Sequence, residues 1–261
     1  MCQPVSDWDE SEFVSKPSVN PYYGESGSDR ASRVRALFDR IAPRYDLVND
    51  VQSFGLHRFW KRRLIRQAQL KKGEKALDVC CGTGDITLSI ARQGLETIGV
   101  DFSPGMLEQA RRRNSASAQA TFIEADALKL PFGNDHFDLL TIAYGLRNIE
   151  DFEAGLRELA RVLKPGGRML VLDFGKPDNR LWRRLYFGYL GWMVPLFGSV
   201  FCGDSAAYSY ILESLKHYPA QQGVADQMKA MGFEAVKIDT ILGGVMSINL
   251  GRKAAAAPKE S

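Results

Sequence analysis

The stretch KALDVCCGTGD, residues 75–85, decides the fold because an apolar run passes directly into a glycine-rich turn. Its first part, KALDVC (75–80), predicts a buried strand, and Gly82 and Gly84 follow it. Glycines between a strand and a helix let backbone N–H groups approach a ligand closely. The dinucleotide-binding fingerprint needs a third glycine, and this chain has Thr87 at that position. The turn therefore argues against a nicotinamide dinucleotide.

Short apolar runs alternate with helical patterns from this turn onward, which predicts βαβ units and a parallel sheet. Further strands are expected at 97–101, 121–126, 137–144 and 168–174, with helices at 86–94, 103–113 and 151–163. Strands at 232–241 and 244–252 are joined by so short a connection that only an antiparallel pair is possible. The expected fold is a Rossmann-like α/β sheet of seven strands, mostly parallel and ending in an antiparallel hairpin. This arrangement is typical of class I S-adenosylmethionine-dependent methyltransferases more than of dehydrogenases.

The segments around the sheet give the expected domain organisation. Residues 1–30, rich in Ser, Pro, Gly and Asp, are expected to form a flexible N-terminal arm, and residues 254–261 a loose tail. We expect 31–253 to be a single methyltransferase domain, with a helical cap at 31–72 and a helical, apolar insertion at 176–230.

The insertion contains an uncharged stretch, residues 185–203, nearly as long as the ~20 apolar residues that span a bilayer. Its glycines and Pro195 break helices in water and weaken that interpretation. We expect a lid or pocket wall, with a plain core segment and a transmembrane helix as the alternatives. Arg180, Arg183 and Arg184 precede it and could meet anionic lipid headgroups or form an ordinary solvated helix face.

The composition excludes several classes of protein. The chain has 261 residues, of which 45% are hydrophobic and 25% charged, as in soluble globular proteins. Its 34 basic and 31 acidic residues leave a net charge of +3, too little for a dedicated nucleic-acid binder. The 4 cysteines show no disulfide or zinc spacing, and Cys80 and Cys81 are best interpreted as small buried fillers. We therefore expect no nucleic-acid partner, no metal and a cytoplasmic location.

Acidic residues follow the next two predicted strands. Asp101 can accept hydrogen bonds from both ribose hydroxyls of a nicotinamide or adenosine cofactor. Asp126, with Ala127, stands where a carboxylate can accept from an exocyclic adenine amine. Each acid alone is as well explained as a cap or a solvated loop residue. Together with Gly82-Thr83-Gly84 and the terminal hairpin, however, they predict a site for S-adenosyl-L-methionine. Asp85 could reach the methionine part of this cofactor or simply favour the first turn of a helix.

Three motifs resemble those of the ubiquinone/menaquinone biosynthesis C-methyltransferases, and the similarity spans about residues 31–252. The first signature is matched by Tyr45-Asp46-Leu47-Val48-Asn49 with Ser53, His57 and Trp60, the second by Arg161-Val162-Leu163-Lys164-Pro165-Gly166-Gly167 with Leu172-Asp173, and the motif after the fourth strand by Tyr144-Gly145-Leu146-Arg147-Asn148. The chain departs from these signatures at Val48 and Gln52, usually Met and aliphatic, and at Asp173 and Gly175, usually Glu and Ser.

The resemblance implies methylation of a ring carbon of a polyprenyl quinone in its quinol form, with S-adenosyl-L-methionine as donor and no metal. The leading interpretation is conversion of demethylmenaquinol to menaquinol, the last step of menaquinone biosynthesis. The alternatives are the 2-methoxy-6-polyprenyl benzoquinol of ubiquinone biosynthesis, or both acceptors. Asp173 and Gly175 modestly favour the naphthoquinol as the acceptor. More remote alternatives are a methyltransferase for another small molecule, a nicotinamide oxidoreductase and a non-catalytic scaffold.

The resemblance also implies roles for individual residues. Arg147 and Asn148 are expected to orient the ring and its oxygen; the alternatives are an arginine paired with a carboxylate and an asparagine capping the next helix. Tyr45 comes from the cap, which this architecture folds over the cofactor. His57 titrates in a useful range and could shuttle the proton, or could pack structurally beside Trp60.

A prenylated substrate would leave its tail in the bilayer and present only its head group. The apolar residues 185–203 are therefore expected to form a hydrophobic mouth. We expect transient, reversible contact with the inner face of the membrane. A homo-oligomer is left open.

Overall fold

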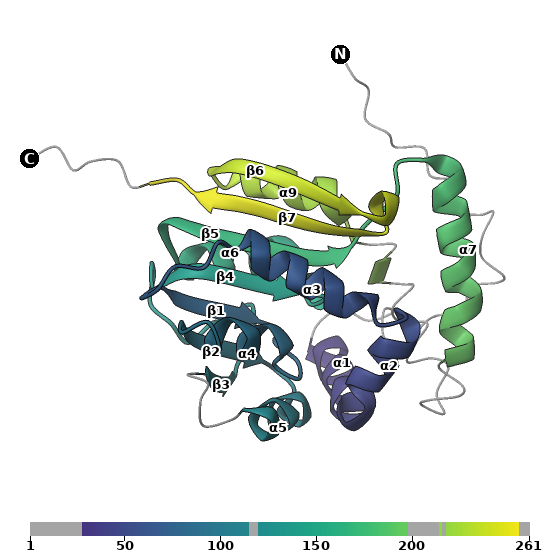
Figure 1. Cartoon of the computed structure of the whole chain (residues 1–261), viewed down its shortest axis with the longest axis horizontal. Helices are drawn as coiled ribbons and strands as arrows, with labels where there is room; N and C mark the ends of the chain where they lie inside the picture. The colour runs from purple at the N-terminus through teal and green to yellow at the C-terminus, as the bar shows by residue number, and fades with distance from the viewer. Residues whose placement is uncertain (1–27, 115–119, 198–213, 216–217, 256–261) are drawn as a thin grey trace, which may run out of the picture.

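A computed structural model describes residues 28–114, 120–197, 214–215 and 218–255 of the chain. Seven strands form one central sheet (Figure 1) in the order β3-β2-β1-β4-β5-β7-β6. Their bounds are β1 Lys75–Val79, β2 Glu96–Asp101, β3 Ala120–Glu124, β4 Phe137–Ala143, β5 Leu163–Phe174, β6 Phe233–Ile241 and β7 Met246–Lys253. Strands β1 to β5 pair in parallel, and β7 runs antiparallel to both β5 and β6. The predicted Rossmann-like α/β sheet with its terminal hairpin is thus confirmed.

Helices cover both faces of the sheet and the edge at which the parallel strands end. On the faces, α4 and α5 pack near β1 to β3, and α6 and α9 pack near β5 to β7. At the edge, α1 and α2 form the first part of the N-terminal cap, and α7 stands across the strand ends, whereas α3 continues from the cap over one face of the sheet against β5 and α4 (Figure 1). The bounds are α1 Ser28–Ile41, α2 Tyr45–Gln52, α3 Leu56–Gln67, α4 Asp85–Ala91, α5 Pro104–Arg113, α6 Phe152–Val162, α7 Arg180–Phe197 and α9 Ala220–Ala230, with short 3₁₀ turns at Ala42–Arg44, Leu146–Asn148 and Leu242–Gly244.

The starts of two helices follow from local sequence signals. Ser103 caps α5, with its Oγ accepting a hydrogen bond from Met106 N at 3.2 Å, and Pro104 occupies the first turn. Asp151 caps α6, with Oδ1 accepting from Ala154 N at 2.8 Å. The alternative that Asn148 caps this helix is therefore wrong.

Thr87 stands where the dinucleotide-binding fingerprint has its third glycine, and its side chain makes a hydrogen bond. Thr87 donates from N and Oγ1 to the buried Asp78, at 3.0 and 2.7 Å. Room for this side chain comes from Gly99 on β2, where a Cβ would lie 2.8 Å from Thr87 Oγ1. Thr141 Oγ1 donates to the other oxygen of Asp78 at 2.7 Å. Burial raises the pKa of Asp78 to about 6 despite these bonds.

Some segments differ from the expected boundaries. Strand β5 begins at Leu163, which pairs with Phe137 before a register shift, so 164–167 form the irregular first part of a strand that was expected to begin at 168. Helix α1 starts at Ser28, slightly before the expected cap. Helix α9 packs on β6 and β7 as part of the core, so the expected insertion at 176–230 does not extend through α9.

Helix α7 is continuous from Arg180 to Phe197 although it includes Gly188, Gly191 and Pro195. The expected helix breakers therefore do not interrupt it. The last residues of the apolar stretch, 198–203, lie outside the described part of the chain. None of the described helices is long and apolar enough to cross a membrane.

Candidate active site

Two cavities lie side by side at the carboxyl ends of the parallel strands. The larger has a volume of about 510 Å³ and is enclosed by the cap, by α7 and by the ends of β4 and β5. The smaller, of about 30 Å³, lies at the glycine turn. Tyr45 and Tyr144 line both cavities, so these two side chains form the boundary between them.

The glycine turn is held by the acid at the end of the neighbouring strand. Gly82 and Gly84 have φ values of +55° and +82°, in the left-handed region that favours glycine. A Cβ on Gly84 would also lie 2.9 Å from the ring of Phe122. Asp101 accepts from Gly82 N at 2.8 Å and from Ser103 N at 3.0 Å. Burial raises the pKa of Asp101, which these backbone bonds partly offset.

The other predicted cofactor residues follow the next strand in the sheet. Asp126 is exposed just beyond β3, and its Oδ1 accepts from Leu128 N at 2.8 Å. Ala127 is buried beside it. Because β1, β2 and β3 are neighbours, the glycine turn, Asp101 and Asp126 follow three adjacent strand ends in the predicted order.

Charged residues tie the cap to the glycine turn. Thr83 Oγ1 donates to Asp46 Oδ1 of α2 at 2.8 Å. Arg113 of α5 donates to Asp46 at 3.0 Å, to Thr83 Oγ1 at 2.9 Å and to Asp85. Lys61 of α3 donates to Asp85 at 2.7 Å. Lys61 and Arg113 were not predicted from the sequence, because nothing in the local sequence indicates which distant carboxylate each would pair with.

On the larger cavity, Arg147 is fixed by a buried ion pair. Its Nη1 lies 2.7 Å from Asp173 Oδ1 and also donates to Tyr144 O at 2.7 Å. The guanidinium carbon stands 4.7 Å from the centre of the Phe174 ring, a cation–π contact. Arg147 therefore makes the carboxylate pair considered from the sequence and lines the cavity as well.

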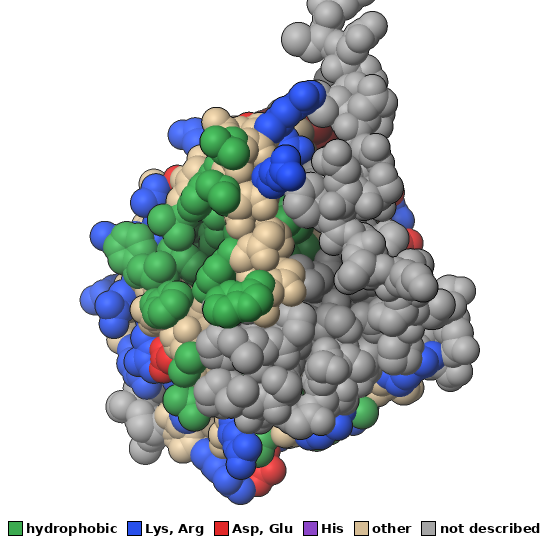
Figure 2. Space-filling model, turned by 90° about the vertical axis from the view of Figure 1, so that its right-hand side faces the viewer, with side chains coloured by type: hydrophobic (Ala, Val, Ile, Leu, Met, Phe, Trp, Pro, Cys, Tyr) green, Lys and Arg blue, Asp and Glu red, His purple; other side chains and the backbone are tan. Residues whose placement is uncertain are grey.

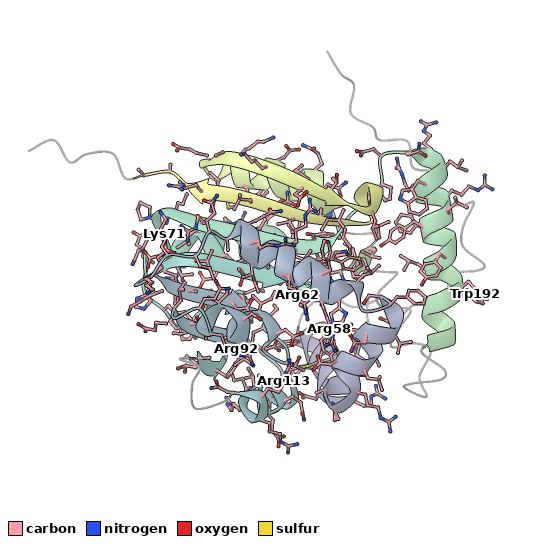
Figure 3. All side chains as sticks on the ribbon, viewed as in Figure 1. Arg58, Arg62, Lys71, Arg92, Arg113 and Trp192 are labelled. Atoms are coloured by element: carbon pink, nitrogen blue, oxygen red, sulfur yellow. The ribbon has the colours of Figure 1, made fainter. Side chains whose placement is uncertain are left out.

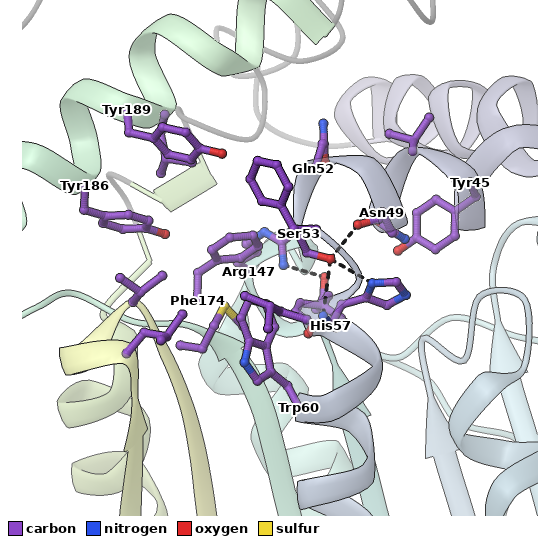
Figure 4. Close-up of a pocket in the computed structure, with 18 of the residues that line it drawn as sticks. Tyr45, Asn49, Gln52, Ser53, His57, Trp60, Arg147, Phe174, Tyr186 and Tyr189 are labelled. Carbon is purple, nitrogen blue, oxygen red and sulfur yellow. Dashed lines mark hydrogen bonds between the residues drawn. The ribbon is translucent and has the colours of Figure 1, made fainter.

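His57 lies on the same cavity, and its hydrogen bonds fix its tautomer. Ser53 Oγ donates to Asn49 O at 2.6 Å and lies 2.8 Å from His57 Nδ1 (Figure 4). Because the single hydroxyl proton is used on Asn49, Nδ1 must donate to Ser53, and the lone pair is on Nε2. Burial lowers the pKa of His57. The imidazole is thus neutral and can accept a proton.

Several polar atoms on this mainly apolar cavity are buried and have no partner among the described residues. They are Gln52 Nε2, Tyr144 OH, Asn148 Oδ1 and Tyr186 OH. Unsatisfied buried polar atoms are rare in proteins, and each needs an explanation such as an absent ligand. Tyr144 also has a φ of +59°, uncommon for a bulky residue and often a mark of a functional position. Its role was not predicted from the sequence.

The mouth of the larger cavity is surrounded by exposed apolar side chains, which we call the apolar collar: Phe54, Leu56, Trp182, Leu185, Tyr189 and Leu242. Phe54 is 80% and Leu185 57% exposed. Figure 2 shows apolar side chains gathered on this face, with Lys and Arg beside them and few acidic groups. The exposed Arg58 and Arg66 belong to α3, and Arg180 and Arg184 to α7.

One departure from the family signature has a structural reason. A Cβ on Gly175 would lie 2.3 Å from Gly244 O and 2.9 Å from Gln221 Oε1. The close backbone approach therefore requires glycine there. No group of three or more His, Cys, Asp or Glu side chains suited to a metal ion occurs in the described part of the chain.

Solved structures of low sequence identity share this fold. A SAM-dependent methyltransferase from Thermotoga maritima superposes with a TM-score of 0.58 at 20% identity, covering 84% of this chain and 99% of that chain. Phosphoethanolamine N-methyltransferase 2 from Haemonchus contortus, solved with phosphomonomethylethanolamine and S-adenosylhomocysteine, has a TM-score of 0.57 at 16% identity, covering 75% and 52%.

Sequence relatives are much closer. The ubiquinone/menaquinone biosynthesis C-methyltransferase UbiE of Azotobacter vinelandii is 40% identical over 238 residues, covering 89% of this chain and 94% of that protein. The enzyme of the same name from Shewanella sp. (strain ANA-3) is 37% identical over 250 residues, covering 93% and 99%. The family model described as "ubiE/COQ5 methyltransferase family" matches residues 26–253. As the three motifs predicted, the chain belongs to the ubiE/COQ5 methyltransferase family.

Proposed function

We propose that the protein transfers a methyl group from S-adenosylmethionine to a ring carbon of a polyprenyl quinol. The observation on which this depends is the pair of cavities that meet at Tyr45 and Tyr144. One is polar and adjoins the glycine turn, whereas the other is large, mainly apolar and open to the surface through the apolar collar. The methyl donor needs a polar site and a lipid acceptor needs an apolar one. The reacting atoms of both would lie at the boundary between the two cavities.

The residues at the strand ends fit S-adenosylmethionine. The carboxylate of Asp101 would hold the ribose hydroxyls, Asp126 and Ala127 would adjoin the adenine, and Gly82-Thr83-Gly84 would pass close to the ligand. When bound, the cofactor would supply an electrophilic sulfonium methyl. Alignment of acceptor and methyl accounts for a large part of catalysis in such reactions, on the order of several kcal/mol.

The larger cavity fits a quinol head group with an isoprenoid tail. Its volume of about 510 Å³ is in the range of small-molecule sites. The unpartnered atoms of Gln52, Tyr144, Asn148 and Tyr186 would meet the ring oxygens, which removes the energetic cost of leaving them unbonded. Tyr45 would lie against the ring at the boundary.

The ring carbon becomes nucleophilic when a quinol hydroxyl loses its proton. His57, neutral and with its lone pair on Nε2, would accept this proton directly or through a water. Arg147 does not give up its own proton at ordinary pH, and Asp173 holds it in place. Its charge would stabilise the quinolate oxygen, and Asn148 would orient the ring.

A naphthoquinol, demethylmenaquinol, is the acceptor that we favour. The names of the relatives cover both quinone pathways, so only residues of the site can favour one acceptor over the other. Asp173 stands where the family usually has Glu, and its side chain is one methylene shorter. Since Asp173 pairs with Arg147 at 2.7 Å, we expect it to hold Arg147 closer to β5 than a glutamate would and so to leave more room for a two-ring head group. The benzoquinol precursor of ubiquinone is the alternative.

The apolar collar and the basic residues beside it also support transient docking on an anionic membrane surface. Apolar side chains can enter the headgroup region, and each Lys or Arg near an anionic surface adds about 1 kcal/mol. The tail could then enter the larger cavity from the bilayer.

The test is to incubate the protein with methyl-labelled S-adenosylmethionine and, separately, reduced demethylmenaquinone and the demethylated benzoquinol, following product mass. Label in the naphthoquinol alone supports the favoured acceptor, and label in both means a dual-function enzyme. If the protein binds the cofactor but labels neither quinol, the quinol assignment is wrong.

A further inference from the structure

Lys61 extends from α3 into the smaller cavity, which it lines together with Gly82, Thr83 and Asp85. Its side chain is only 13% exposed, and Nζ lies 2.7 Å from Asp85 Oδ2. Burying an ammonium group is costly unless its charge is used. An ammonium has three N–H donors, so the bond to Asp85 leaves donors to face the cavity.

Lys61 shares Asp85 with a second cation. Arg113 donates to the other oxygen of Asp85, as well as to Asp46 and Thr83. Burial would raise the pKa of Asp85, but Lys61 and Arg113 outweigh burial and hold it at about 2. Asp85 therefore remains an anion that positions Lys61, while Arg113 is also paired with Asp46.

The chemistry of a sulfonium cofactor determines what the smaller cavity must hold. Its sulfur has three substituents, namely the methyl, the adenosyl group and an amino-acid chain. If the adenosyl group is held near Asp101 and the methyl faces the boundary at Tyr45 and Tyr144, the amino-acid chain is left for the glycine turn. This is the part of the site that Lys61 lines.

We propose that Lys61 binds the carboxylate of the cofactor's amino-acid chain and so selects carboxylate-bearing sulfonium ligands over those that lack this group. This inference rests on the proposed use of S-adenosylmethionine. It gives Lys61 a binding role in addition to its place in the ion pairs between the cap and the glycine turn.

The experiment compares the affinities of two ligands by calorimetry, without turnover. S-adenosylmethionine and its decarboxylated analogue differ only in the carboxylate. We expect the unmodified protein to bind the first at least about tenfold more tightly, as for a charged hydrogen bond. Lys61→Met should weaken binding of S-adenosylmethionine roughly 10- to 100-fold and binding of the analogue by less than about threefold. Lys61→Arg should retain most of the preference.

Lys71→Met is the matched control, since Lys71 is exposed and lies at the far end of the molecule from Arg113 and the site (Figure 3). It should change neither affinity. Equal binding of both ligands by the unmodified protein would overturn the role of Lys61 without any variant, and so would equal losses for both ligands in Lys61→Met. Binding of neither ligand would instead overturn the proposed cofactor, and this inference with it.

Discussion

The two cavities that meet at Tyr45 and Tyr144 are built in opposite ways. The smaller one is lined by the glycine turn and by charged side chains that are already hydrogen-bonded, such as Asp78 and Asp85. The larger one is mainly apolar, and some of its polar atoms have no partner among the described residues. In the proposed function the smaller cavity is the donor side and the larger one the acceptor side. The donor side would thus be preorganised before its ligand binds, whereas ring oxygens of the acceptor would complete the acceptor side.

Because the two cavities are built differently, a substitution that impairs the function of one should leave ligand binding in the other unchanged. Arg147→Met would test this most strongly, because it removes the cation proposed to stabilise the quinolate. We expect kcat to fall about 10²- to 10³-fold, the usual cost of losing one such group. The affinity for S-adenosylmethionine, measured by calorimetry, should change less than about threefold.

The same substitution leaves Asp173 buried without its cation, so the free energy of unfolding should fall by about 3–5 kcal/mol. The double variant Arg147→Met with Asp173→Asn controls for this effect. It should regain much of the stability, measured by urea unfolding, while activity stays low. Recovery of activity in the double variant would mean that Arg147 acts only through folding.

Asp101→Asn tests the opposite side. The amide nitrogen would face the N–H of either Gly82 or Ser103, which turns one hydrogen bond into a repulsion. The affinity for S-adenosylmethionine should fall about 100-fold. The affinity for a quinol analogue, measured by fluorescence quenching, should not change. A parallel loss of both affinities would show that the two sides are not independent.

His57 is expected to give the acceptor side its own pH dependence. Burial lowers the pKa of His57, so the neutral form needed to accept a proton persists below pH 6.5. The rate should fall only as the pH drops through this lowered pKa. His57→Gln should reduce kcat roughly 10- to 100-fold and abolish this acidic limb. An unchanged pH–rate profile would assign the proton transfer to another group.

The smallest effect is expected at the mouth of the larger cavity. Leu185→Ser removes one exposed apolar side chain of the collar, worth about 1–2 kcal/mol if it is buried against a lipid tail. KM for a long-chain quinol in anionic vesicles should rise several-fold, and KM for a short-chain quinol should stay constant. Equal changes for both substrates would contradict the proposed path for the tail.

Much of the donor side could be predicted from the sequence because its signals are local. A buried strand, a glycine turn and an acid at the end of the next strand can each be recognised from the residues in their own segment. Ser103 followed by Pro104 likewise predicts the start of a helix. The family resemblance added Arg147, Asn148, Tyr45 and His57. The structure brings all four to the larger cavity, and their roles remain proposals.

What the sequence could not predict depends on contacts between distant segments. In the sequence, Lys61 and Arg113 cannot be distinguished from ordinary surface charges. Their ion pairs with Asp85 depend on how α3 and α5 pack in the folded protein. The orphaned hydroxyl of Tyr144 follows from the burial of its surroundings and from its positive φ, neither of which has a local signal. The continuity of α7 through Gly188 and Pro195 likewise runs against helix propensity.

The two cavities that Tyr45 and Tyr144 separate are formed by different parts of the chain, and the sequences of these parts can evolve at different rates. Most of the donor side comes from the continuous stretch between β1 and β3, whereas the acceptor side is made largely by helices encoded before and after it. Replacing α2, α3 and α7 would thus alter the acceptor while leaving most of the methyl-donor side in place, apart from Tyr45, Asp46 and Lys61. A fold arranged in this way lends itself to acquiring new lipid substrates by exchange of its outer helices.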